Sequence, residues 1–532
     1  MSRQTPKSEG NAELAYTIKH ELNSVEYFWE GVVMKRTVFV FLVGVFLAVC
    51  VIANHEIAKI IPFFDGYVQE NMELWNIPGM AVGIVKDGEL VFSKGYGVKD
   101  VETGEPVTPE TIFQIGSTSK AFTSFLLAQL IDRGEVNWKD RVVDHFPEFR
   151  MYDPWVTSNF LIEDLMPQHS GLPPYSGDFM AFFDCPRDEI IEKIRFIPPA
   201  NTFRTDFAYQ NNLFLVAGKV IENHSDLTWE ENVEKEIFAV LGMSESSNTP
   251  EGYFETGNYA TTYGRYNDEL TRIDFDGKPF KFAYVYGPAG GINSNIVDMS
   301  KWISLQMNKG AFGDDVLLSR VQYDFLHRPA TFIGSSDSKI LFYCQGWIYE
   351  QRRDYRLFWH DGETLGCKTM VAYLPDDDLG IVVLSNLAGT HLPDLLAYVL
   401  FDLYKEVEFI DYSGEYLKML IDYTKTVPEE PEITFSDPLP LENYAGIYYN
   451  DFFEKVSVSV KEGRLEMEFI GRDITFDLEF FNRDFFMITD SDLLEMNGVV
   501  VAFSIDKTGV AEAITLRGEM ISKGLEILYR IE

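Results

Sequence analysis

The chain of 532 residues is too long for one ordinary domain and predicts about two to four folded units. A composition of 46% hydrophobic and 24% charged residues excludes a disordered chain. The formal net charge of -38 at pH 7 would repel a phosphate backbone or an anionic lipid surface, so we expect no nucleic-acid partner. The four cysteines form no C-x-x-C pair and lie at no zinc-ligand spacing from a histidine, so we expect no disulfide framework, no metal site and no cofactor.

An uncharged apolar stretch at residues 37–53 follows Lys35 and Arg36, a pattern typical of an export signal. Its length is at the lower limit of what spans a bilayer. Two alternatives therefore stay open, a signal peptide that is cleaved and a membrane anchor that is retained. Both would place the rest of the chain outside the cytoplasm, in the periplasm or the extracellular space. Because the signal-like pattern begins at Met34 after a polar preamble, translation starts either there or at Met1.

The next part of the chain mixes strand and helix patterns. Two strand-like runs at residues 81–85 and 89–92 flank a turn at Gly88 and predict a β-hairpin. A long apolar run at residues 121–133, followed by Gly134, predicts a buried helix. Later candidates are helices at 213–223 and 298–308 and strands at 369–374 and 380–384. Strands at both ends with helices between them predict an α+β domain whose sheet joins early and late segments.

Residues 427–441 are rich in proline and acids and predict a stiff linker. Beyond them the hydrophobic pattern changes to a period of two, with Val456, Val458 and Val460 alternating with polar residues. This alternation predicts a small antiparallel barrel or sandwich. We therefore divide the chain into an N-terminal preamble with its signal or anchor (1–55), an α+β domain (56–426), the linker (427–441) and a β domain (442–532).

Ser117 is the strongest candidate for a nucleophile. Acyl transfer by a serine needs a base beside the hydroxyl, and Lys120 follows three residues later. If Ser117 opens the predicted helix, both side chains share one face, and burial would lower the pKa of the lysine toward the working range.

The S-x-x-K spacing is weak evidence by itself, because it also occurs at Ser336 and Ser504. Ser336 lies in a polar run that predicts a loop, and Ser504 lies in a predicted strand of the β domain. Only Ser117 stands between a strand-like segment with Gly116 and a buried helix.

The segment FQIGSTSK at residues 113–120 resembles the nucleophile motif of the class C-like serine β-lactamases and penicillin-binding proteins. The other motifs of that family follow in order. They are HSGLP at 169–173, Tyr209-Gln210-Asn211 as Y-x-N, a glycine-rich stretch at 290–298, and His360-Asp361-Gly362 as an H-x-G form of the third motif. A literal K-T-G at residues 507–509 lies between two strand runs of the β domain and predicts a hairpin turn instead.

The resemblance implies a β-lactamase-like fold, an antiparallel sheet flanked by helices with an all-helical subdomain. It implies that Ser117 is acylated and that Tyr209 with Lys120 relays the proton to the leaving group. Asn211 would bind the substrate amide, and His360 would line the site opposite Tyr209 on the edge strand. Gly362 and Glu363 would line the substrate site, with the backbone N–H groups of Ser117 and Glu363 as the oxyanion hole.

The function expected from the resemblance is a serine hydrolase acting through an acyl-enzyme on small peptides, including D-residue peptides, or on esters. Asp361 and Glu363 would weaken binding of a substrate carboxylate, which argues against efficient penicillin hydrolysis. A weak β-lactamase or DD-peptidase stays an alternative, and so does a non-catalytic β-lactam or peptidoglycan sensor or scaffold. Residues 249–286, for which no element is predicted, are a candidate loop over the site.

The β domain begins with a segment at residues 444–448 that looks like the start of the lipocalin-like barrel found in some peptidases and esterases of this family. In those relatives the barrel shapes the site or builds oligomers. A homo-oligomer assembled through this domain is therefore an expectation of the resemblance.

Overall fold

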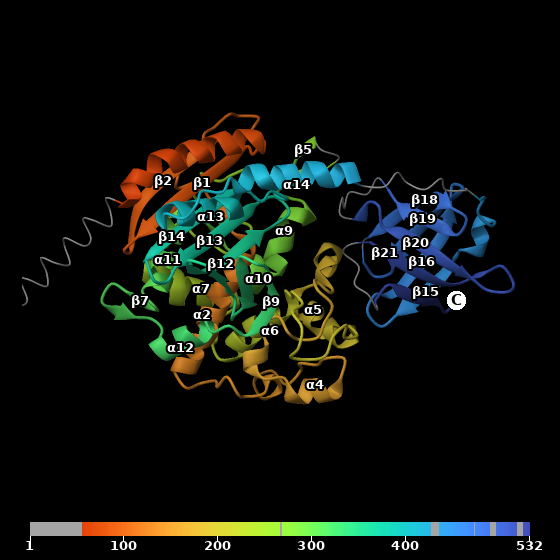
Figure 1. Cartoon of the computed structure of the whole chain (residues 1–532). Helices are drawn as coiled ribbons and strands as arrows, with labels where there is room; N and C mark the ends of the chain where they lie inside the picture. The colour runs from red at the N-terminus through yellow and green to blue at the C-terminus, as the bar shows by residue number, and fades with distance from the viewer. Residues whose placement is uncertain (1–55, 267–268, 427–435, 473, 490–495, 519–524) are drawn as a thin grey trace, which may run out of the picture. The chain divides into compact units, whose positions relative to one another are not determined.

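The computed structural model describes residues 56–266, 269–426, 436–472, 474–489, 496–518 and 525–532 (Figure 1). The predicted export segment and most of the predicted linker lie outside these residues. Among the helices that are described, none is long and apolar enough to cross a membrane. The division of the chain into four segments stays a prediction.

An antiparallel eight-stranded sheet forms the centre of the first domain, in the order β2-β1-β14-β13-β12-β11-β10-β9. Its strands are β1 (Gly79–Lys86), β2 (Glu89–Gly97), β9 (Thr331–Ser335), β10 (Lys339–Tyr343), β11 (Ile348–Arg352), β12 (Arg356–Glu363), β13 (Lys368–Leu374) and β14 (Leu379–Ser385). The predicted hairpin is β1 and β2, and β1 also pairs with β14, so that Met80 lies opposite Ser385. The prediction that early and late segments share one sheet is confirmed.

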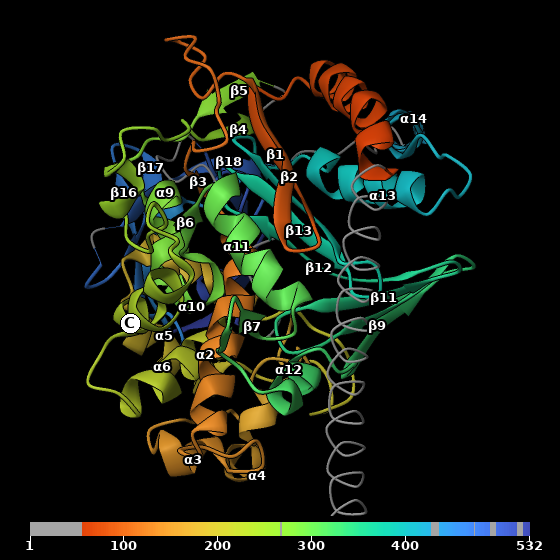
Figure 2. The same ribbon diagram turned by 90° about the vertical axis from the view of Figure 1, so that its left-hand side faces the viewer.

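Two helices cover the two faces of this sheet (Figure 2). α11 (Ile296–Met307) packs on β1 and β14, and α13 (Leu392–Tyr404) packs on β13 and β14. The side chains of β13 and β14 are buried throughout, because both faces of these strands are covered. Burial on both faces explains the continuous apolar runs at residues 370–374 and 379–384 of these strands.

The buried helix α2 (Lys120–Asp132) lies beside the sheet and packs against α6 (Asn212–Asn223), α10 (Gly287–Gly290) and α12 (Arg320–Leu326). A 3-10 turn, η1 (Gly116–Ser119), precedes it. Ser117 therefore lies in the turn before the helix and does not open the α-helix itself. The reason is local: the Lys120 N–H donates to the Ser117 carbonyl, which tightens the first turn.

Short helices form the predicted all-helical part. They include α3 (Val142–His145), α4 (Pro154–Asn159), α5 (Arg187–Lys193), α6 and α7 (Trp229–Val233). The segment 249–286 is more than a loop, since it contains η6 (Gly252–Phe254), the hairpin of β4 (Tyr263–Tyr266) and β5 (Glu269–Arg272), and α9 (Lys278–Val285). Its aromatic side chains pack into a cluster of their own around Tyr253 and Phe280.

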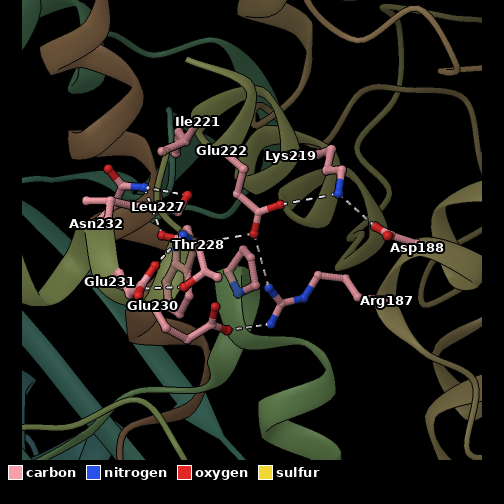
Figure 3. Close-up of polar contacts among 12 residues, drawn as sticks. Arg187, Asp188, Lys219, Ile221, Glu222, Leu227, Thr228, Glu230, Glu231 and Asn232 are labelled. Carbon is pink, nitrogen blue, oxygen red and sulfur yellow. Dashed lines mark hydrogen bonds and ion pairs between the residues drawn. The ribbon is translucent and has the colours of Figure 1, made fainter. Parts of the chain in front are cut away.

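Ion pairs and hydrogen bonds join α5, α6 and α7 (Figure 3). Arg187 contacts Glu230 at 2.7 Å and Glu222 at 3.9 Å, and Lys219 contacts Asp188 at 3.1 Å. The Arg187 guanidinium also donates to the carbonyls of Tyr284 and Val285, both at 3.2 Å. One side chain thus connects α5 with α6, α7 and the end of α9.

Replacing Arg187 by alanine is expected to lower the free energy of unfolding by about 2 kcal/mol, because two carbonyls and two carboxylates lose their donor together. Denaturant unfolding monitored by tryptophan fluorescence measures the change. Arg141→Ala is the matched control, since its exposed pair with Asp144 should contribute nothing measurable. Equal stability of the two variants would contradict this role for Arg187.

The β domain is a closed antiparallel barrel in the order β15-β16-β17-β18-β19-β20-β21-β22. Its strands are β15 (Gly446–Asn450), β16 (Glu454–Lys461), β17 (Arg464–Phe469), β18 (Thr475–Asn482), β19 (Phe485–Ile488), β20 (Val500–Ile505), β21 (Ala511–Arg517) and β22 (Ile527–Arg530). Val456 and Val458 are buried as the alternation predicts. The K-T-G at residues 507–509 lies in the turn between β20 and β21, so the hairpin interpretation is confirmed.

Candidate active site

Ser117 and Lys120 meet as the sequence predicts. The Lys120 Nζ atom lies 3.0 Å from Ser117 Oγ. The same amine donates to Asn211 Oδ1 at 2.7 Å and to the Ala289 carbonyl at 3.0 Å. Three acceptors arranged around one amine fix its position, so that the nitrogen faces the serine hydroxyl.

The environment of Lys120 favours the neutral amine. The side chain is completely buried, and this burial lowers its pKa from 10.5 to about 7, although the charges of Asp178 and Asp361 oppose the shift. Near neutral pH a substantial fraction of the amines therefore has a lone pair that can accept a proton. A base with a pKa close to the working pH is well matched to general-base catalysis.

Tyr209 approaches the same amine from the loop before α6. Its ring centroid lies 4.7 Å from Lys120 Nζ. Burial raises the pKa of Tyr209 well above 10, Tyr343 adds to the rise, and a hydrogen bond with the Ser117 side chain opposes it. The phenol is therefore neutral at ordinary pH, so it can donate or relay a proton but is a poor base by itself.

Asn211 is brought into the site, but its amide already has protein partners. The Oδ1 atom accepts from Lys120, and Nδ2 donates to Asp178 Oδ2 at 2.5 Å. Asp178, which no sequence motif indicated, lies in η3 (Asp178–Phe183). The available signal was a single acid at the start of an otherwise apolar run, FMAFF.

His360 lies on β12 opposite Tyr209, with 6.3 Å between the ring centroids, as predicted. Its Nε2 atom shares a hydrogen bond of 2.9 Å with the Tyr343 hydroxyl. Burial lowers the pKa of His360 to about 4, with the charge of Asp361 opposing the shift. The imidazole is therefore neutral and cannot attract a substrate carboxylate by charge.

The prediction that His360 lies on an edge strand is wrong. β12 is bordered by β13 on one side and by β11 on the other, because β9, β10 and β11 extend the sheet. The pairing with β11 covers residues 356–359 and ends at Trp359. The part of β12 that carries the third motif therefore extends past this pairing, and there it approaches the turn that holds Ser117.

Two glycines allow the close approach of β12 to the turn that holds Ser117. A Cβ atom on Gly362 would lie 2.0 Å from the Ile115 carbonyl oxygen, and one on Gly116 would lie 2.6 Å from the Glu363 nitrogen. Gly116 also has a φ of 53°, which side chains other than glycine rarely adopt. The spacing between the two backbones therefore requires glycine on both sides.

The Glu363 N–H is directed toward this turn. The Thr364 N–H donates to the Cys367 carbonyl, which makes these two residues a hydrogen-bonded pair. In an antiparallel ladder the next pair, Glu363 with Lys368, is then a pair without mutual hydrogen bonds. The Glu363 N–H points away from β13 as a result, toward Gly116 and Ser117, which is the direction that the predicted oxyanion hole needs.

Lys368, which no sequence motif indicated, compensates the acids of the third motif. Its buried amine lies 2.5 Å from Asp361, 3.4 Å from Asp394 and 3.6 Å from Glu363. Burial opposes the charged forms, but these contacts raise the pKa of Lys368 and hold the pKa of Asp361 below its usual range. Lys368 is therefore fully engaged by protein carboxylates.

Residues 64–404 match the Beta-lactamase family, so the chain belongs to this family, and the resemblance drawn from the motifs is confirmed. Residues 430–527 match a domain of unknown function, DUF3471.

The chain is also similar to curated proteins. The chain is 26% identical to "Unguisins hydrolase ungD" of Aspergillus violaceofuscus, over 86% of this chain and 88% of that protein. It is also 26% identical to "Protein flp" of Staphylococcus aureus, over 63% of this chain and 65% of that protein. Its fold is similar to that of the octameric penicillin-binding protein homologue from Pyrococcus abyssi, with a TM-score of 0.59 and 21% identity, over 88% of this chain and 100% of the other.

Proposed function

We propose that the protein is a serine hydrolase that forms an acyl-enzyme on Ser117. The observation that carries the proposal is the 3.0 Å contact between Ser117 Oγ and Lys120 Nζ, an amine whose burial lowers its pKa to about 7. A serine hydroxyl at its free pKa is a weak nucleophile, and an adjacent base of this kind activates it.

The proposed reaction has two halves. Lys120 accepts the Ser117 proton while Oγ attacks the substrate carbonyl carbon, and the backbone N–H groups of Ser117 and Glu363 stabilise the oxyanion. The neutral phenol of Tyr209, with Lys120, passes the proton to the leaving group as its bond to the carbonyl carbon breaks. In the second half a water molecule gives its proton to the same pair, attacks the acyl carbon and releases the acid, and Ser117 regains its proton.

We propose small peptides, including peptides with D-residues, or esters as the substrates. Two observations support this over penicillin hydrolysis: His360 is neutral, and Lys368 is held by three carboxylates, so neither offers a ready charge for a substrate carboxylate. The curated relative named a hydrolase of unguisins is aligned over most of both chains, which favours hydrolysis over a sensor or scaffold role. We also propose export through residues 37–53, which N-terminal sequencing of the native protein would test.

Labelling with a fluorophosphonate probe tests the nucleophile. We expect the wild type to be labelled and Ser117→Ala to be unlabelled. Ser336→Ala is the matched control, because Ser336 has the same S-x-x-K spacing but lies in the turn between β9 and β10. Equal labelling of wild type and Ser117→Ala would refute the proposal. Labelling without turnover across ester, D-peptide and β-lactam substrates would favour the sensor alternative.

A further inference from the structure

The buried carboxyl of Asp178 lies near the proposed base, Lys120, with the Asn211 amide between them. Asp178 is 5% exposed, and its Oδ2 atom accepts the 2.5 Å hydrogen bond from Asn211 Nδ2. Its Oδ1 atom is buried and has no hydrogen-bond partner of standard geometry among the described residues. Burying a carboxylate in this way lowers the free energy of unfolding, so stability does not explain its position beside the site.

Asn211 links this carboxyl to Lys120. A carboxylate can only accept hydrogen bonds, so Asp178 requires the NH₂ end of the amide, and this turns Oδ1 toward the Lys120 amine. Without the carboxylate the amide could rotate and present its NH₂ group to Lys120. Two donors would then face each other, and the amine would lose one of the three acceptors that hold it against Ser117.

Charge also connects the two groups. Burial raises the pKa of Asp178 to about 7, while the Asn211 amide, the Lys120 charge and the Tyr286 hydroxyl oppose the rise. The charge of Asp178 in turn raises the pKa of Lys120 against the larger effect of burial. The other titratable groups that face the pair are Asp361 and the neutral His360 from β12, Tyr209 from the loop before α6, and Tyr286 between α9 and α10.

We propose that Asp178 is a positioning residue for the general base: it orients the Asn211 amide, thereby holds the Lys120 amine against Ser117, and balances the charge of that amine. This inference rests on the proposed function, since it assigns Asp178 a role through Lys120. Asp178 itself need not touch substrate.

The pH dependence of kcat/KM tests the proposal. In Asp178→Asn the side chain can still accept from Asn211, but its negative charge is gone. Because this charge raises the pKa of Lys120, the acid limb of the kcat/KM profile should move to lower pH by about one unit. In Asp178→Ala the acceptor is lost as well, and we expect kcat/KM to fall by about 100-fold, with Asp178→Asn restoring most of it. Asp184→Asn is the matched control, because this exposed acid ends the same 3-10 helix and pairs with Lys278 instead.

A second variant covers the case in which Asp178→Asn does not fold. The Tyr286 hydroxyl donates to Asn212 Oδ1 at 3.0 Å and to the Gly177 carbonyl at 3.3 Å, and its proximity also favours the charged form of Asp178. Tyr286→Phe removes this hydroxyl, so the acid limb should move in the same direction by a smaller amount. An acid limb that coincides with the wild type in these variants, or full activity of Asp178→Ala, would overturn the role of Asp178. Absence of hydrolysis and of Ser117 labelling in the wild type would instead refute the proposed function, so the two failures are distinguishable.

Discussion

Replacing Lys120 by methionine is expected to lower kcat by about 10³- to 10⁴-fold, because the variant keeps the nucleophile but loses its base. Methionine has a similar length and is apolar, so it suits a completely buried position. In the wild type the acylation rate should rise with pH through about 7, as the Lys120 amine loses its proton. Stopped-flow acylation measured from pH 5 to pH 9 should show this limb in the wild type and not in the variant.

The pH dependence of the free energy of unfolding of Lys120→Met tests the lowered pKa of Lys120. The folded-state pKa of Lys120, about 7, lies below its ordinary value of 10.5, so between these values the unfolded chain binds more protons than the folded chain. The contribution of Lys120 to the free energy of unfolding therefore rises with pH in this window, by about 1.4 kcal/mol per pH unit. Lys120→Met should lose this slope, whereas Lys139→Met, at an exposed lysine, should keep it. Parallel pH curves for wild type and Lys120→Met would contradict the lowered pKa.

Local periodicity predicted much of the fold. The hairpin of β1 and β2, the helix α2 and the alternation along β16 and β17 are each set by residues close in sequence. Such signals do not say how many strands join a sheet. The addition of β9, β10 and β11 beyond β12 was therefore missed, and with it the interior position of the strand that carries His360. The amphipathic helix α14 (Tyr412–Thr426) was also not predicted.

The order of the motifs in the sequence predicted one site that contains Ser117, Lys120, Tyr209, Asn211 and His360. Asp178 and Lys368 were not predicted as site residues, because their roles depend on contacts between segments far apart in the sequence. Asp178 reaches Lys120 through Asn211. Lys368 contacts the acids of the third motif across the β12–β13 hairpin, and it contacts Asp394 of α13 as well. A single charged residue in an apolar segment was the available signal in both cases, and such a residue has no partner visible in the sequence alone.

Gly362→Ala is expected to lower kcat/KM by at least about 100-fold, because the methyl group would separate the two backbones that form the proposed oxyanion hole. The new Cβ would lie 2.0 Å from the Ile115 carbonyl oxygen and 2.4 Å from Thr369 Oγ1. Thr369 also donates to that carbonyl at 2.8 Å, so a shift of either neighbour alone would break this bond. β12 must therefore shift, and the Glu363 N–H shifts with it.

Gly334→Ala is the matched control, since Gly334 lies in β9 of the same sheet and an added Cβ there meets nothing within 4 Å. Titration of active sites with the fluorophosphonate probe distinguishes a misfolded fraction, which is not labelled, from folded protein that is acylated slowly. If the oxyanion hole has moved, the probe should still reach full labelling of folded Gly362→Ala, only more slowly. Wild-type acylation rates in this variant would mean that the Glu363 N–H is not an oxyanion donor. A reduced labelled fraction that reacts at the normal rate would mean that Gly362 serves folding alone.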